Sequence, residues 1–203
     1  MGDLAALDLT PVHDALASKA HAKIADICDQ LMLKIASEGV QFQDEWPYAV
    51  HLLGHIYVND ISSARFLWKS IPLVVKDGQP EVVAAWTIAK RLWTRDYIGV
   101  HEAIKSYSWS AQTKDLVTAY SGLYVERMFQ LILSAYSIIS IQDTALFLGM
   151  TVDDATKCVL QRGWSIEQSS GMITVNKPPV VSEQKLDATK LQCLTEYVFN
   201  LEH

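Results

Sequence analysis

One stretch of the sequence, residues 140–177, restricts the possible folds of this chain more than any other. Its pattern is typical of a helix, a tight turn at Gly149-Met150, a second helix, and two short strands at 164–167 and 173–175. Helix, turn, helix and two strands in that order predict a small winged helix. The rest of the chain has to be arranged around this unit.

Both predicted helices of this unit begin with a capping signal. Ser140 stands three residues before Asp143, and Thr151 stands three residues before Asp154, which resembles the spacing of a capping box. The apolar residues that follow define the expected interior. We expect the following side chains to face inward: Ala145, Leu146, Leu148, Ala155, Val159, Leu160, Trp164, Ile166, Ile173 and Val175.

The region before the winged helix, residues 10–139, has the periodicity of stacked helices. The predicted helices are 14–37, 48–58, 61–69, 81–94, 99–107 and about 110–138. The second and third of these form an antiparallel hairpin in which Leu53-Gly54-His55-Ile56-Tyr57 satisfies the L-G-x-x-Y part of a tetratricopeptide repeat. The segment 64–68 (ARFLW) also recurs 25 residues later as AKRLW at 89–93. We therefore predict a mostly α fold with degenerate helical repeats of the tetratricopeptide type.

The tail consists of a predicted proline-containing linker, residues 178–186, and a predicted closing helix, residues 187–203. Residues 1–9 and 178–186 lack apolar periodicity, so we expect them to be mobile. The helix carries an apolar stripe at coiled-coil spacing, which a partner has to cover. Docking onto its own domain is one possibility, and joining helices of other chains is the interpretation we favour. The stripe consists of Leu191, Leu194, Val198 and Leu201.

Charge and composition exclude several classes of function. The net charge of −6 and the pI near 5.4 argue against a general affinity for nucleic acid or an anionic membrane. The apolar run 128–141 is shorter than a membrane span, and the first nine residues lack the pattern of a signal peptide. The three widely separated cysteines fit a reducing compartment. We expect a soluble intracellular protein.

Many winged helices bind DNA, so the charge of this one is informative. Residues 141–177 carry four acids, Asp143, Asp153, Asp154 and Glu167, against three bases, Lys157, Arg162 and Lys177. Two of the acids lie where the second helix would approach a major groove. An autonomous DNA-binding protein is therefore a minor alternative, and docking to another protein is favoured.

His51 and His55 stand four residues apart on a predicted helix, a spacing at which two imidazoles can share a zinc ion. The glutamate of an H-E-x-x-H motif is absent, however, and no third ligand is apparent in the sequence. We interpret the pair as packing residues. The sequence also lacks a G-x-S-x-G motif, a P-loop and a G-x-G-x-x-G motif. It predicts no catalytic residue, no cofactor, no metal and no small-molecule substrate.

Five segments taken together resemble the subunit 8 family of the COP9 signalosome, in its plant-like form. They are ARFLWKSIP at 64–72, LWTRDY at 92–97, LFLGM at 146–150, GW at 163–164 and LTEYV at 194–198. The resemblance implies the PCI architecture, in which helical repeats precede a winged helix. It implies a non-catalytic scaffold subunit, found in nucleus and cytoplasm, of the complex that removes Nedd8 from cullins. The metalloprotease centre of that complex lies on a different subunit.

The resemblance also implies which surfaces bind partners. In the family, winged helices associate edge to edge and C-terminal helices gather in a bundle. The resemblance therefore implies that other PCI subunits bind at a strand edge at Ile173 and Val175, and at the stripe formed by Leu191, Leu194, Val198 and Leu201. Related subunits of the proteasome lid and of initiation factor 3 remain the alternatives within the fold. Which subunit contacts which face, and whether the isolated chain self-associates, stays open.

Overall fold

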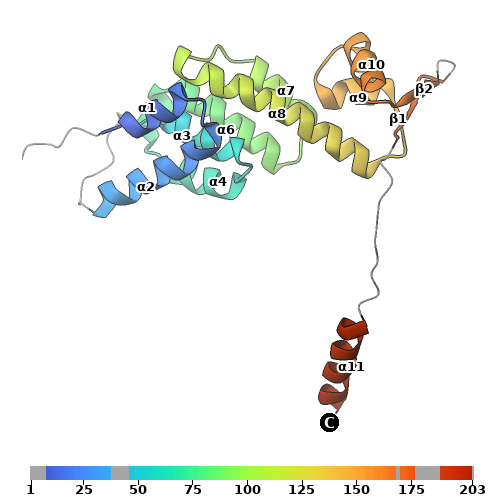
Figure 1. The fold of residues 1–203 in the computed structure, drawn as a ribbon. Helices are drawn as coiled ribbons and strands as arrows, with labels where there is room; N and C mark the ends of the chain where they lie inside the picture. The colour runs from blue at the N-terminus through green and yellow to red at the C-terminus, as the bar shows by residue number, and fades with distance from the viewer. Residues whose placement is uncertain (1–7, 38–45, 168–169, 177–187, 203) are drawn as a thin grey trace, which may run out of the picture.

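The computed structural model describes residues 8–37, 46–167, 170–176 and 188–202. Helices α1 to α7 stack at one end of the molecule, and α8 runs from them to a small unit that contains a sheet (Figure 1). Among the described residues, none of the helices has the length and apolarity that crossing a membrane requires. The mostly α fold with a winged-helix unit is confirmed. The elements are α1 Thr10–Ala17, a 3-10 turn His21–Lys23, α2 Ile24–Ser37, α3 Tyr48–Tyr57, α4 Ile61–Ser70, α5 Leu73–Gly78, α6 Pro80–Trp93, α7 Tyr97–Lys105, α8 Ala111–Ala135, β1 Ile138–Ser140, α9 Ile141–Leu148, α10 Val152–Gln161, β2 Ser165–Glu167, β3 Met172–Thr174 and α11 Ala188–Glu202.

The helices of the arm, which we define as α1 to α7, are joined by a recurring turn. In the described residues three non-glycine positions have a positive φ, and each follows a helix: Lys19 at 56°, Asn59 at 64° and Arg95 at 57°. After each of them, a backbone N–H bonds the carbonyl five residues earlier, the longer bond of a Schellman motif. These bonds are Ala20 to Ala15, Asp60 to His55 and Asp96 to Arg91, each 2.9 Å.

The first of these turns corrects one sequence prediction. The segment 14–37 was expected to be a single helix, but it breaks after Ala17 and resumes as α2 at Ile24. Lysine gives no sequence signal for a left-handed turn, because glycine and asparagine are the residues that usually mark one. The break produces the helical pair α1 and α2, which packs beside α3.

Helix α3 lies at the centre of the arm, where it packs against α2, α4, α6 and α8. Nine of its ten residues are buried, and Tyr57 at its end is the exception. Beside it, the rings of Trp68 on α4 and Trp86 on α6 stack with their centroids 5.2 Å apart and an angle of 4° between their planes. Both rings are half-buried, and stacked aromatic pairs of this kind contribute to packing. The arm is therefore organised around a helix whose side chains face other helices on all sides.

The winged-helix unit contains a strand that the sequence did not predict. Within the described residues the sheet has the order β1-β3-β2 and is antiparallel throughout, with Ile173 paired to Ile139 on one side and Ile166 on the other. Strand β1 begins three residues after α8 ends. Ile138 and Ile139 continue the apolar pattern of that helix, which concealed the strand.

The sheet order corrects the expected open edge. Strand β3 is the middle strand of the described sheet, so the prediction of an edge at Ile173 and Val175 is wrong. Ile173 is 0% exposed and Val175 is 6% exposed. A partner strand could approach only β1 or β2, which are the outer strands of the described sheet. The unpredicted strand β1 occupies one side of β3 and is the physical reason for the difference.

The expected interior of this unit is mostly correct. The prediction that Leu146 and Leu160 face inward is wrong, because these residues are 51% and 55% exposed. Ile166 is half-buried. Both predicted helix caps are present, with the Ser140 and Thr151 hydroxyls accepting from the backbone N–H groups three residues on and donating to the carboxylates of Asp143 and Asp154. The buried members are Ala145, Leu148, Ala155, Val159, Trp164, Ile173 and Val175.

Helix α7 holds the C-terminal end of α9. The Nε2–H of His101 donates to the carbonyl of Phe147 at 2.8 Å, and the Lys105 ammonium donates to the carbonyl of Gly149 at 2.7 Å. Gly149 adopts φ +64°, and a Cβ at this position would lie 2.3 Å from the Cγ of His101. Only glycine satisfies both the left-handed turn and the close approach.

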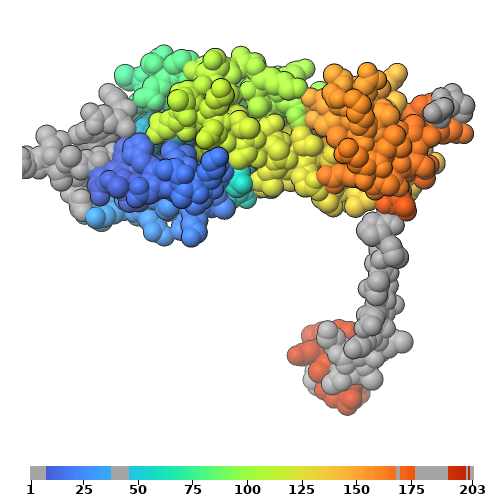
Figure 2. Space-filling model, turned by 45° about the horizontal axis from the view of Figure 1, so that its top comes forward, coloured from blue at the N-terminus to red at the C-terminus, as the bar shows by residue number. Residues whose placement is uncertain are grey.

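A second contact joins the winged helix to α8. The Arg162 guanidinium forms a two-pronged ion pair with the Glu126 carboxylate and also lies 3.9 Å above the Phe129 ring. The Arg162 hydrogen bonds lower the pKa of Glu126 to about 2. Phe129 packs edge-on against Trp164 with centroids 5.9 Å apart. Figure 2 shows the result as one continuous surface from the arm to the winged helix.

Candidate partner-binding surfaces

The closing helix α11 offers apolar side chains to solvent. From Gln192 to Phe199 every residue is exposed, and the helix stands apart from the other elements in Figure 1. A soluble helix usually buries one face against its own domain. The exposed fractions are 61% for Leu194, 67% for Tyr197, 54% for Val198, 62% for Phe199 and 86% for Leu201.

The exposed apolar residues are not spread evenly around α11. At 100° per residue, Leu194, Tyr197, Val198 and Leu201 fall within a stripe about 100° wide. Phe199 lies outside it. We call these four residues the tail stripe. The sequence prediction contained three of them and missed Tyr197, whose ring belongs to the same face. The fourth predicted residue, Leu191, lies in α11, but its side chain is outside the described residues.

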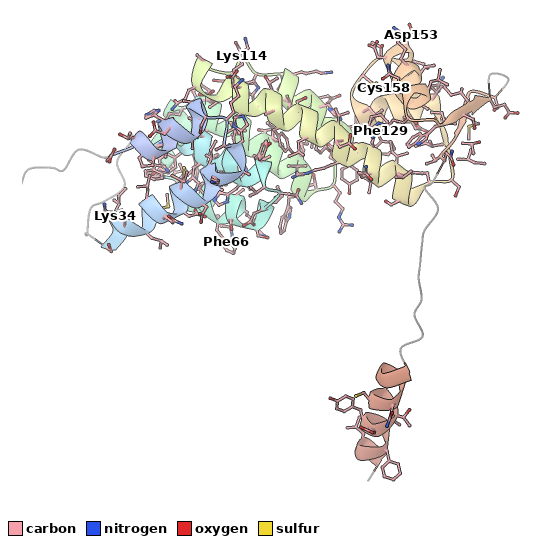
Figure 3. The ribbon with its side chains drawn as sticks, viewed as in Figure 1. Lys34, Phe66, Lys114, Phe129, Asp153 and Cys158 are labelled. Atoms are coloured by element: carbon pink, nitrogen blue, oxygen red, sulfur yellow. The ribbon has the colours of Figure 1, made fainter. Side chains whose placement is uncertain are left out.

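Other exposed apolar side chains lie on the arm and on the winged helix. On the arm they include Phe66 at 70%, Leu73 at 74% and Val74 at 72% exposed. Figure 3 places Phe66, a residue of α4, at the lower rim of the arm. On the winged helix they include Leu146, Leu160 and Val152, the last 45% exposed. Sequence reasoning missed the arm residues, because Phe66 and its neighbours fit the pattern of a packed helical hairpin.

The second helix of the winged helix, α10, has few free cations to offer a DNA backbone. Its N-terminal turn carries Asp153 and Asp154, and Asp154 is held by the Thr151 cap. Figure 3 shows Asp153 at the outer end of the unit. Arg162 is committed to Glu126, and Lys157 lies 3.9 Å from Asp154. Phosphate binding needs cations that face outward together, and the described residues of α10 do not provide such a set.

His51 and His55 are buried in α3, and the structure brings a third group to them. Asp29 on α2 places its Oδ1 2.8 Å from His51 Nε2 and 3.4 Å from His55 Nε2. The two imidazoles stack with centroids 4.8 Å apart, and their Nε2 atoms are 3.1 Å apart. Burial, followed by the neighbouring His55, lowers the pKa of His51. Asp29 is 22 residues from His51 in the sequence, so spacing could not reveal it.

Comparisons with known proteins give one consistent result. A family model described as the CSN8/PSMD8/EIF3K family matches residues 43–184, which run from before α3 through the winged helix. The chain is 61% identical over 197 residues to the Arabidopsis thaliana protein named COP9 signalosome complex subunit 8, covering 97% of this chain and 100% of that protein. It is 32% identical over 191 residues to the Xenopus laevis protein of that name, covering 92% and 94%. For the Dictyostelium discoideum protein of that name the identity is 25% over 197 residues, covering 95% and 97%.

Proposed function

The chain belongs to the CSN8/PSMD8/EIF3K family, and on this basis we propose that it is a non-catalytic scaffold subunit of a COP9 signalosome. That complex removes Nedd8 from cullin-RING ubiquitin ligases. The function of this chain is assembly: the arm and winged helix provide a rigid body, and α11 joins helices of other PCI subunits. We place it in the nucleus and the cytoplasm, without a nucleic-acid or membrane partner.

The observation that carries this proposal is the exposure of the tail stripe. An isolated helix of about 15 residues is only marginally stable in water, and most helices in proteins are stabilised by packing of their apolar face. Leu194 and Val198 of α11 are more than half exposed. Burying each such side chain is worth about 1.5–3 kcal/mol, so a partner that covers the stripe stabilises the helix and the complex together.

The test introduces negative charge into the tail stripe. We expect the double variant Leu194→Asp with Val198→Asp to abolish incorporation, because two carboxylates would have to be buried in an apolar interface. Incorporation is measured by co-purification with the other subunits. The stability of the isolated chain should change little, because both side chains are more than half exposed.

A matched control adds the same charge elsewhere on α11. Gln192→Asp with Thr195→Asp introduces two carboxylates off the tail stripe. This variant should incorporate like the unmodified chain. Full incorporation of the variant with Leu194→Asp and Val198→Asp would refute the proposed role of α11. If neither double variant were incorporated, added negative charge anywhere on α11 would prevent assembly, and the tail stripe would have no special role.

The family also includes subunits of the proteasome lid and of initiation factor 3, and a second experiment distinguishes these alternatives from a signalosome subunit. A native pull-down analysed by mass spectrometry should recover signalosome subunits rather than proteasome-lid or initiation-factor subunits. The 61% identity to a signalosome subunit supports the first outcome. An isolated chain that cleaved a Nedd8–cullin conjugate would contradict the non-catalytic role.

A further inference from the structure

Three potential metal ligands meet between α2 and α3, and the assembly proposed above gives them no role. The Asp29 Oδ1, His51 Nε2 and His55 Nε2 atoms form a triangle with sides of 2.8, 3.1 and 3.4 Å. The two histidine side chains are 1% and 4% exposed, while the aspartate side chain is 50% exposed. The triangle is thus buried on one side and open to solvent on the other.

Hydrogen bonds alone cannot make all three contacts of this triangle favourable. The indole N–H of Trp46 points at His51 Nδ1 at 3.3 Å, and an indole nitrogen can only donate. His51 Nδ1 is then an acceptor, and the single ring proton of neutral His51 sits on Nε2. If His55 Nε2 also carries a proton, two N–H groups face each other 3.1 Å apart. If it does not, its lone pair faces the Asp29 oxygen. At most two of the three contacts are satisfied in either case.

A cation satisfies all three groups at once, because it accepts a lone pair from each. Tetrahedral zinc holds nitrogen and oxygen ligands at about 2.0–2.2 Å, which separates neighbouring ligand atoms by about 3.3 Å. The observed separations of 2.8, 3.1 and 3.4 Å differ from that spacing by about half an ångström or less.

The identities of the ligands also fit zinc. Two histidines four residues apart on one helix, with a carboxylate from elsewhere, form a ligand set found in zinc sites that keep one position for water. Neutral imidazole is the form that binds a metal. The half-exposed Asp29 provides the open side on which water completes the coordination.

We propose that Asp29, His51 and His55 bind one Zn²⁺ ion, which links α2 to α3 and leaves a fourth position to water. On binding, the proton of His51 moves from Nε2 to Nδ1, so the Trp46 indole N–H, 3.3 Å away, has to turn from that atom, and the binding free energy of the ion has to exceed the loss of this hydrogen bond. The ion stabilises the folded chain by mass action, since the unfolded chain does not hold the three ligands together. The proposal does not depend on the role of the chain in a signalosome.

The experiment uses the full-length chain without an affinity tag, first freed of metal with a chelator. Zn²⁺ is titrated against a chromophoric competitor, and Co²⁺ serves as a spectroscopic probe of the same site. We expect one equivalent of Zn²⁺ to bind and the Co²⁺ complex to give the intense visible absorption of tetrahedral coordination. Absence of a thiolate charge-transfer band would show that Cys28, Cys158 and Cys193 are not ligands.

Variants identify the ligands. Asp29→Asn keeps an oxygen that accepts from His51 but removes the negative ligand, and His55→Gln removes an imidazole. Replacing a residue that only hydrogen-bonds a metal ligand typically lowers metal affinity by roughly 10- to 100-fold. Each of these two variants removes a ligand itself, so each should lower the affinity for Zn²⁺ by more than that. His13→Gln removes an exposed histidine on α1 and should bind like the unmodified chain. Zn²⁺ should raise the melting temperature of the unmodified chain and of His13→Gln, but not of Asp29→Asn.

Circular dichroism of the metal-free proteins shows whether each variant is folded. Asp29→Asn is the decisive one, because its substitution is half-exposed and preserves the hydrogen bond to His51. The proposal is overturned if the unmodified chain binds no Zn²⁺, if folded Asp29→Asn binds as tightly as the unmodified chain, or if the Co²⁺ complex shows thiolate ligation. In each of these cases the triangle is a hydrogen-bonded cluster only.

Discussion

The joint between α7, α8 and the winged helix contrasts with the tail helix α11. At the joint, donors are matched to acceptors within the chain: His101 and Lys105 bind carbonyls at the end of α9, and Arg162 binds Glu126. At α11, the apolar residues of the tail stripe are each more than half exposed. The winged helix is thus fixed by its own chain, whereas α11 needs a surface from elsewhere. Substitutions at the joint should change stability, and substitutions in α11 should change assembly.

The largest expected effect is at Gly149. We expect Gly149→Ala to destabilise the fold by about 2–4 kcal/mol, because the alanine would be strained at a positive φ and its Cβ would overlap the His101 ring. Urea unfolding of the isolated chain measures the change. At Gly122, in α8, an added Cβ would meet no atom within 4 Å, so Gly122→Ala should instead stabilise by about 0.5–1 kcal/mol. Equal effects of the two alanines would show that the joint is not tightly packed.

A smaller effect, on assembly rather than stability, distinguishes two aromatic residues of α11. Tyr197 lies in the tail stripe and Phe199 outside it, although their exposed fractions are similar at 67% and 62%. We expect Tyr197→Ala to weaken binding to the other subunits by about 1–2 kcal/mol and Phe199→Ala by less than half of that. Competition with the unmodified chain during reconstitution measures both. A larger loss for Phe199→Ala would mean that the partner covers a different face of the helix.

The parts of this fold that the sequence predicts are those specified by local chemistry. The starts of α9 and α10 follow from a hydroxyl residue three positions before an aspartate, and both caps are formed. The hairpin α3–α4 follows from periodicity and from the Asn59-Asp60 turn. The tail stripe follows from its spacing, and only Tyr197 was left out. In each case the interacting groups lie within one or two helical turns of each other.

The features that escaped prediction depend on contacts between distant segments. Strand β1 is defined by its pairing with β3, more than 30 residues away, and Ile138 alone fits the end of a helix. The outward direction of Leu146 and Leu160 depends on how α9 and α10 pack together. Asp29 meets His51 across two helices. Sequence spacing contains no information on such pairs, so a third ligand for the two histidines became visible only in the fold.

The smallest expected effect tests the ion pair at the joint through its pH dependence. The pKa of Glu126 is lowered from 4.5 to about 2 by Arg162, so the folded state binds the proton more weakly than the unfolded state does. The stabilisation is therefore fully present above pH 4.5 and is lost as the pH falls from 4.5 towards 2. Because the Glu126 and Arg162 side chains are 47% and 38% exposed, solvent screening limits the contribution to about 0.5–1 kcal/mol.

A double-mutant cycle with Glu126→Gln and Arg162→Met isolates this contribution, since Arg162 also stacks on Phe129. We expect a coupling free energy of about 0.5–1 kcal/mol at pH 7 that declines towards zero near pH 2. As a control, the ion pair of Lys157 with Asp154, whose side chains are 73% and 58% exposed, should show no measurable coupling when Lys157→Met is combined with Asp154→Asn. If the coupling free energy of Glu126 and Arg162 did not change with pH, the ion pair would not stabilise the joint, and Arg162 would act there through its packing on Phe129. The winged helix would then be held by apolar and backbone contacts, and its attachment to the arm would be as strong in acid as at neutral pH.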